Sequence, residues 1–294
     1  MVPSFRSAPG SLLIRQPMQR TDFTIETNGV RLKALDANDN GRFIVMTENG
    51  DIIAHDFRTT LKRVRYRTPL EFRFPKIRRL DQNRFLVCNS RTSGWPNGKV
   101  FDLDGQELDS LYLGDAIEDI LIFPNNIVVM YHEEGIYGCQ PPSGSGLAVF
   151  SHDGRQLWGF NDLIGKGVLS KDALIGDGGP LCRNGTESVL FLSHYLKPQL
   201  AELRLGDFAL NFSAIPNRVH FATSLSPIGE TEIIFHLPPS GYPEPDNEKF
   251  FWWDRQSDDV EELPEKVADW ITGIGEGRFL ARHDFGYTVI DPLA

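Results

Sequence analysis

The stretch Asn83-Arg84-Phe85-Leu86-Val87-Cys88 joins a turn-forming residue to a short β-forming run, and this pattern recurs along the chain. Asn40-Gly41-Arg42-Phe43-Ile44-Val45-Met46 precedes it and Asn125-Asn126-Ile127-Val128-Val129-Met130 follows it. Later copies are Glu187-Ser188-Val189-Leu190-Phe191-Leu192, Thr231-Glu232-Ile233-Ile234-Phe235-His236 and Gly277-Arg278-Phe279-Leu280-Ala281-Arg282. Equivalent positions are 42, 42, 62, 44 and 46 residues apart. Such a period, built of strand-like units, indicates a propeller, solenoid or array.

A second run follows within each unit. In Gly98–Leu108 and Gly146–Leu157 an Asp-Gly pair separates two β-like stretches, which predicts a hairpin with a type I′ turn. A candidate inner strand precedes most of the marked turns, and the candidates are Val30–Leu35, Ile77–Leu80, Ile117–Phe123, Val219–Leu225 and Trp270–Ile274. Each repeat therefore consists of four predicted strands.

The pattern Val-Phe-x-x-Asp-Gly-x-x-Leu at Val100–Leu108 and Val149–Leu157 resembles the strand-turn-strand units of six-bladed β-propellers with NHL or lactonase-like repeats. The Trp-Asp dipeptides that would end each blade of a WD-repeat protein are absent, apart from Trp253-Asp254. We therefore expect an all-β, six-bladed propeller of four-stranded blades.

The N-terminal segment is predicted to close the ring. The last repeat has three strands and ends at Asp291, whereas Thr21–Glu26 alternates as a single strand would. Placing that strand on the outer edge of the sixth blade removes an open sheet edge. We expect one domain over residues 1–294, with residues 1–20 as an N-terminal extension and Asn161–Cys182 as a long loop between the third and fourth blades.

Composition and charge argue against several classes of partner and location. The 294 residues carry 40 Asp and Glu against 30 Lys and Arg, and this net charge of −10 argues against nucleic acid as the main partner. No apolar stretch approaches the roughly 20 residues that span a bilayer, and the first 21 residues lack the apolar core of a secretory signal. Three irregularly spaced cysteines suit a reducing compartment. We expect a cytoplasmic monomer that binds neither nucleic acid nor membrane.

Loop lengths predict a binding face. If the strands of each blade are named A to D from the channel outward, the B–C and D–A connections share one face and the A–B and C–D turns the other. The long connections are Arg91–Asn97, Glu133–Gly146, Pro238–Glu248, Asn161–Cys182 and Gly206–Pro216, all assigned to the first face. Connections longer than their structural task requires commonly carry function, so we expect this long-loop face to bind the partner.

Aromatic side chains in these connections are candidate anchors for a partner. They are Trp95, Tyr137, Tyr242 and Phe208. Each side chain could instead plug its own loop, and the sequence does not distinguish the two roles.

Polar residues follow the B strands at the same face. Glu48, Ser90, His132, His194 and Asp284 occupy equivalent positions in their repeats. His132 and His194, together with Glu133, Glu134 and Asp177, could form a metal or acid–base site, since imidazole and carboxylate groups do both. Alternatively, each histidine is a hydrogen-bonded structural residue at a strand end. We count His132, His194, Glu133 and Asp177 among the candidate binding residues.

Six-bladed propellers that resemble the gluconolactonase and senescence-marker family are lactone hydrolases, and the resemblance implies a divalent metal ion in the central channel, held by Glu, Asn and Asp. The candidate inner strands offer Asp36, Asp81, Glu118, Asp119 and His220, without a matching Asn. A metal-dependent hydrolase is therefore the alternative function.

The sequence also contains one basic and one acidic stretch. Residues 62–79 are basic, with Arg63, Arg65 and Arg67 on one face of an outer strand, and residues 254–269 are acidic. Either stretch could bind a partner or simply be a solvated edge. No complete catalytic set is evident. We expect a non-enzymatic module without a cofactor that binds a protein, in one version an acidic inhibitor or immunity-type protein that neutralises a basic enzyme.

Overall fold

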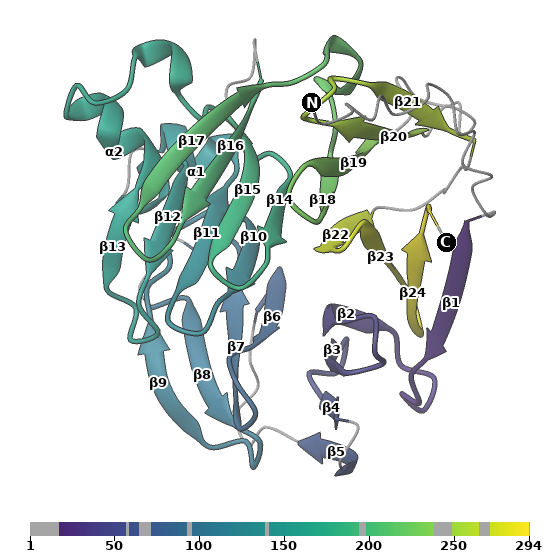
Figure 1. Ribbon diagram of the computed structural model, residues 1–294. Coiled ribbons are helices and arrows are strands. Elements are labelled where there is room, and N and C mark those ends of the chain that lie inside the picture. The colour runs from purple at the N-terminus through teal and green to yellow at the C-terminus, as the bar shows by residue number, and fades with distance from the viewer. Residues whose placement is uncertain are drawn as a thin grey trace, which may run out of the picture.

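Six four-stranded antiparallel sheets surround a central channel in the computed structural model (Figure 1). The structure describes residues 18–56, 59–64, 72–92, 96–138, 141–193, 198–237, 249–264 and 271–293. The predicted six-bladed propeller is confirmed.

The first three blades follow one another along the chain. Blade 1 consists of β2 (Leu32–Ala37), β3 (Phe43–Thr47), β4 (Ile52–Asp56) and β5 (Thr59–Val64). Blade 2 consists of β6 (Pro75–Arg79), β7 (Arg84–Asn89), β8 (Gly98–Asp102) and β9 (Glu107–Leu111). Blade 3 consists of β10 (Ile117–Ile122), β11 (Ile127–Tyr131), β12 (Leu147–Phe150) and β13 (Gln156–Gly159).

The last three blades complete the ring. Blade 4 consists of β14 (Leu181–Asn184), β15 (Ser188–Ser193), β16 (Gln199–Arg204) and β17 (Ala209–Ala214). Blade 5 consists of β18 (Ser224–Ile228), β19 (Glu232–Leu237), β20 (Lys249–Asp254) and β21 (Val260–Leu263). Blade 6 consists of β22 (Ile271–Gly275), β23 (Arg278–His283), β24 (Gly286–Asp291) and β1 (Gln19–Thr24).

Ring closure by the N-terminal strand is confirmed. β1 pairs antiparallel with β24 from Gln19↔Asp291 to Thr24↔Gly286, so the first and last strands share one sheet. Phe23 stacks on Tyr287 with ring centroids 4.7 Å apart. The edge of β24 is therefore covered by a strand that lies more than 250 residues away in sequence.

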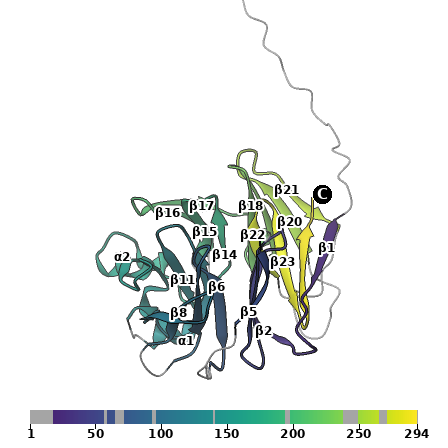
Figure 2. The same cartoon turned by 90° about the horizontal axis from the view of Figure 1, so that it is seen from below.

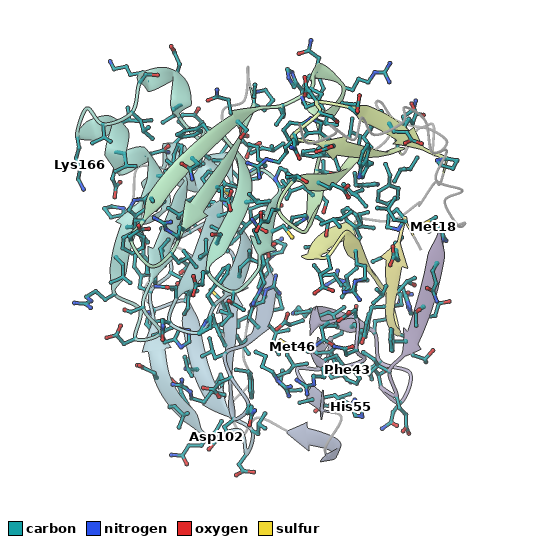
Figure 3. All side chains as sticks on the ribbon, viewed as in Figure 1. Met18, Phe43, Met46, His55, Asp102 and Lys166 are labelled. Atoms are coloured by element: carbon teal, nitrogen blue, oxygen red, sulfur yellow. The ribbon has the colours of Figure 1, made fainter. Side chains whose placement is uncertain are left out.

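The core lies between neighbouring sheets. β11 is buried at all five positions and β7 at four of its six, because a blade is covered on both faces by its neighbours. Outer strands are more polar, as in β9, where four of five residues are exposed. Side chains crowd the space around the sheets (Figure 3). Within blade 1 the cross-strand partners Phe43 and His55 stack with ring centroids 5.4 Å apart.

Three local predictions are wrong. In the Asp-Gly hairpins only the glycine has positive φ, 84° at Gly105 and 83° at Gly154, and a register shift accompanies each turn. These are bulged turns, not type I′ turns, which need two residues with positive φ. The inner strand expected over Val219–Leu225 begins only at Ser224, since residues 217–219 form a short 3₁₀ helix. Cys182, assigned to a loop, lies in β14, where burial raises the pKa of its thiol to about 12.

A buried histidine makes stability depend on pH. His236 in β19 is 2% exposed and its ring lies 5.1 Å from that of Phe250. Burial lowers the pKa of His236 from 6.5 to about 4. The unfolded chain therefore takes up a proton at His236 at higher pH than the folded chain does. The contribution of the neutral His236 to the free energy of unfolding is complete above about pH 6.5 and is lost as the pH falls toward about 4.

We expect His236→Leu to flatten this pH dependence. The loss between pH 6.5 and 4 that is due to His236 amounts to about 3 kcal/mol, since one pKa unit corresponds to about 1.4 kcal/mol. Urea unfolding at several pH values measures it. An identical acid-induced loss in the wild type and in His236→Leu would contradict the assignment.

Candidate functional site

The long connections gather at one end of the propeller. The B–C connection of blade 3 carries α1 (Glu133–Tyr137) and the 3₁₀ turn η1 (Ser143–Ser145), and the segment from blade 3 to blade 4 carries α2 (Phe160–Gly165) and η2 (Lys171–Ala173). The last helical turn, η3 (Asn217–Val219), precedes blade 5. In Figure 2 α1 lies at the lower end of the blades, whereas the C-terminus of the chain lies near their upper end. Among the described helices, none combines the length and apolar character needed to cross a bilayer.

Exposed apolar side chains concentrate on this long-loop face. Six of the eight large apolar residues that are exposed in the described part of the chain lie in its B–C and D–A connections. They are Phe74, Tyr137, Val168, Leu174, Phe221 and Phe285. Phe221 is 80% and Tyr137 64% exposed. The other two, Leu108 and Leu157, lie on the outer strands β9 and β13.

The predicted aromatic anchors have different outcomes. Tyr137 lies in α1 on the long-loop face and is exposed, and its role as an anchor stays a prediction. Trp95 and Tyr242 lie outside the described residues. Phe208 was placed on the wrong face: residues 205–208 form the C–D turn between β16 and β17, and the ring is half-buried, stacked on Trp158 at 6.3 Å. The segment Gly206–Pro216 is therefore mostly strand β17 and not a D–A connection.

The structure brings His132, Glu133 and Asp177 together. His132 directly follows β11, and its Nε2 lies 3.6 Å from Asp177 Oδ1 while its Nδ1 lies 3.7 Å from Glu134 Oε2. Asp177 Oδ1 also accepts a hydrogen bond from the backbone N–H of Glu133, at 3.0 Å. The imidazole thus lies between two carboxylates, one from α1 and one from the loop that leads to blade 4. His194 lies outside the described residues.

A glycine allows this loop to reach His132. A Cβ on Gly178 would lie 2.9 Å from the Glu118 side chain and 3.1 Å from the Tyr131 carbonyl oxygen. Only glycine lets the backbone next to Asp177 approach the ends of β10 and β11 this closely.

The cluster around His132 does not have the arrangement of a metal site. Arg91 lies 3.7 Å from Asp115 and also forms an ion pair with Glu134. In the described part of the chain no group of three or more His, Cys, Asp and Glu side chains is arranged to hold a metal ion. The geometry therefore favours an ion-pair network that holds α1 in place.

Arg78 lies on the inner strand of blade 2 and lines the central channel. From β6 its guanidinium donates to the carbonyl oxygens of Ile120 in blade 3, at 2.6 Å, and of Leu35 in blade 1, at 3.3 Å. It also binds Asp119 at 2.5 Å. Burial disfavours the charged guanidinium, but Asp119 and Asp36 outweigh burial and raise the pKa of Arg78. One side chain therefore joins three blades.

This arrangement does not fit the channel metal implied by the lactonase resemblance. Asp119 is bound by Arg78, and Asp36 accepts the backbone N–H of Arg79 at 2.7 Å. A fixed guanidinium would repel a cation at this level of the channel. On the long-loop side of Arg78 the channel widens into a cavity of about 760 Å³, which is lined by Lys76, Glu118, His132 and Asp177 among others.

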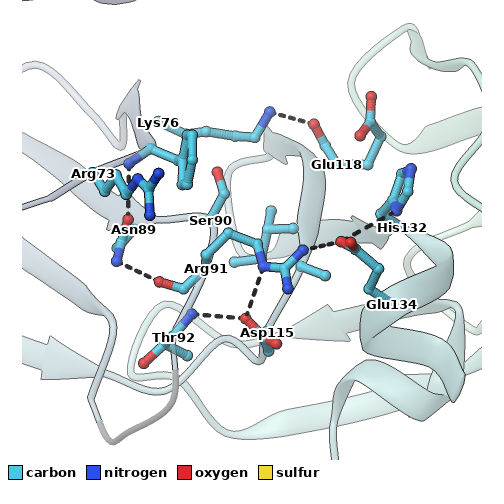
Figure 4. Close-up of a pocket in the computed structure, with 13 residues that line it drawn as sticks. Arg73, Lys76, Asn89, Ser90, Arg91, Thr92, Asp115, Glu118, His132 and Glu134 are labelled. Carbon is cyan, nitrogen blue, oxygen red and sulfur yellow. Dashed lines mark hydrogen bonds and ion pairs between the residues drawn. The ribbon is translucent and has the colours of Figure 1, made fainter. Parts of the chain in front are cut away.

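A second cavity, of about 860 Å³, opens between blades 2 and 3 on the same face (Figure 4). It shares Lys76, Glu118 and His132 with the channel cavity. Neither this cleft nor the exposed residues Phe74, Phe221 and Phe285 was predicted. Ser90 was noted only as the residue that follows a B strand, and the cleft depends on the register between β6 and β7, which the sequence does not show.

Comparisons with known proteins show the fold alone. No protein-family model matches the chain. No curated protein matches it in sequence. A virginiamycin B lyase from Staphylococcus aureus is 10% identical with a TM-score of 0.52, and the match covers 93% of this chain and 99% of the lyase.

Two further propellers have similar scores. The GH74 enzyme of Niastella koreensis is 14% identical with a TM-score of 0.51, over 89% of this chain and 37% of the enzyme. The Dos1 propeller is 10% identical with a TM-score of 0.50, over 91% of this chain and 69% of Dos1. At these identities the likeness says nothing about activity.

Proposed function

We propose that the protein is a non-enzymatic module that binds a protein partner through its long-loop face. One observation carries the proposal: six exposed apolar side chains lie in the connections of this face, and the two others among the described residues lie on outer strands. Exposed apolar groups that gather on one surface are typical of interaction sites. Aromatic rings such as Phe221 and Tyr137 are frequent anchors of protein interfaces.

A basic partner fits the charge of the protein. The net charge is −10, and the long-loop face presents exposed carboxylates as well as exposed Arg and Lys side chains. Among the carboxylates are Glu48, Glu133, Asp172 and Asp284. Opposite charge speeds the encounter of two proteins and excludes wrong partners. An inhibitor or immunity-type protein that neutralises a basic enzyme in the cytoplasm, acting as a monomer, is the specific form that we propose.

A lactonase-like hydrolase with NHL-type repeats has less support. Its metal ion would need free acidic ligands in the channel, where Arg78 binds Asp119. Elemental analysis of the purified protein separates the two functions. A stoichiometric divalent ion would contradict the binding-module proposal.

We expect the triple variant Tyr137→Ser, Phe221→Ser, Phe285→Ser to lose affinity for the partner while it keeps the fold. The partner is identified by co-purification from the source organism and mass spectrometry, and the affinity is then measured by calorimetric titration. A buried interface aromatic contributes about 2 kcal/mol or more, so a single true anchor among the three lowers the affinity roughly thirtyfold.

The matched control is Leu108→Ser with Leu157→Ser, which removes exposed apolar side chains from the outer strands. We expect the control to bind like the wild type. If the control loses affinity and the triple variant with a native circular dichroism spectrum does not, the binding surface is on the blade edges and the proposal is wrong.

A further inference from the structure

The cleft between blades 2 and 3 contains a hydroxyl group that makes no hydrogen bond within the described part of the chain. Ser90 is 8% exposed; its N–H donates to the Phe74 carbonyl at 2.8 Å and its carbonyl accepts from Ile117 N–H at 2.9 Å. Both backbone groups are thus satisfied. The Ser90 Oγ has no hydrogen-bond partner within the described residues, and Figure 4 shows it directed into the open space of the cleft. The hydroxyl is therefore free to hydrogen-bond a molecule that enters the cleft.

A lysine lies next to this hydroxyl. Lys76 pairs with Cys88 in the β6–β7 ladder, and the Ser90–Phe74 hydrogen bond continues the same ladder. Lys76 and Ser90 are therefore diagonal neighbours on one face of the two strands, about 7–8 Å apart and within reach of a lysine side chain. The Lys76 Nζ donates to the backbone carbonyl of Glu118.

No carboxylate hydrogen-bonds this ammonium group within the described residues. Burial lowers the pKa of Lys76, although nearby Asp119 partly opposes the effect. An ammonium group with one carbonyl partner keeps two donors for a ligand.

The three cations and three carboxylates of the cleft lining balance in number, but they are not evenly paired. Arg91 is neutralised by Asp115 and Glu134. The Arg73 guanidinium lies 5.1 Å from the Phe74 ring centroid and makes no ion pair within the described residues. Glu118 is the one carboxylate of the lining that acts on Lys76, and Asp119, which also attracts Lys76, is bound by Arg78.

We propose that this cleft binds a small molecule through an oxyanion group, a carboxylate or a phosphate, which accepts hydrogen bonds from Lys76 Nζ and Ser90 Oγ. Charge-assisted hydrogen bonds of this kind are about twice as strong as neutral ones. Arg73 adds attraction from the rim, and the volume of about 860 Å³ accommodates a ligand of metabolite size. The inference is independent of the protein-binding proposal, because its test uses no protein partner.

Calorimetric titration and thermal melting with inorganic phosphate and with citrate, at constant ionic strength set by NaCl, test the site. We expect saturable binding of at least one anion with a concentration-dependent rise in melting temperature. The anion that binds shows whether the site prefers phosphate or carboxylate. In Lys76→Met and in Ser90→Ala we expect the Kd to rise at least tenfold.

The control is Lys99→Met, which removes a cation of blade 2 that is paired with Glu107 at 2.7 Å, outside the cleft. It should bind like the wild type. Ser90→Ala removes a single oxygen atom, so it keeps the test valid if Lys76→Met fails to fold. No saturable binding of either anion, or binding that both cleft variants retain, which would indicate an adventitious ion only, overturns the proposal.

Discussion

A protein that lacks residues 1–27 is expected to lose most of its stability, because blade 6 loses its outer strand and the ring loses its closure. The truncation removes six paired positions with β24, the stack of Phe23 on Tyr287 and the buried side chain of Ile25. Two apolar side chains and newly exposed surface on β24 together amount to about 5 kcal/mol, comparable with the whole stability of many domains. Thermal melting followed by circular dichroism measures the effect.

Truncation of residues 1–17 alone keeps β1 and isolates the contribution of the strand. We expect the protein that lacks residues 1–27 to melt at a lower temperature than the protein that lacks residues 1–17. If they melt at the same temperature, the pairing of β1 with β24 does not stabilise the ring and the closure described above is wrong.

Arg78→Met is expected to destabilise the protein by about 3–5 kcal/mol, the range found when one partner of a buried ion pair is removed. The Arg78 and Asp119 side chains are 17% and 18% exposed, so Asp119 would remain in the channel without its cation. The hydrogen bonds from Arg78 to Leu35 and Ile120 would also be lost. Urea unfolding gives the free energy directly.

Arg84→Met is the matched control in the same blade. Arg84 lies 2.7 Å from Asp81, and their side chains are 41% and 40% exposed. Exposed pairs of this kind contribute at most about 1 kcal/mol. Equal losses for Arg78→Met and Arg84→Met would show that Arg78 does not join the blades.

The sequence predicts the ring because its decisive signals are local. The apolar runs of the B strands repeat at a nearly constant spacing, and the alternation of Thr21–Glu26 identifies the strand that the last repeat lacks. The short inner strand β14 was not predicted, since its four residues follow a glycine-rich loop and contain two polar side chains. The inner strand of blade 5 was placed too early for a related reason: Val219 is buried in a 3₁₀ turn and not in a strand.

The candidate site was predicted less completely because it depends on exposure and register. Phe221 and Phe85 are equally apolar in sequence, yet one is 80% exposed and the other fully buried. Phe208 was assigned to the wrong face because the end of β16 cannot be located from composition. Lys76 and Ser90 are 14 residues apart and become neighbours only through the antiparallel pairing of β6 with β7.

The central claim, that the long-loop face binds a protein, is tested most directly by photo-crosslinking in the source organism. The crosslinking amino acid p-benzoylphenylalanine replaces Phe221 on this face in one protein and Leu157 on an outer strand in another. We predict that one protein is crosslinked specifically from position 221 and not from position 157. A partner crosslinked from position 157 alone, or no crosslinked protein from position 221, would contradict the claim.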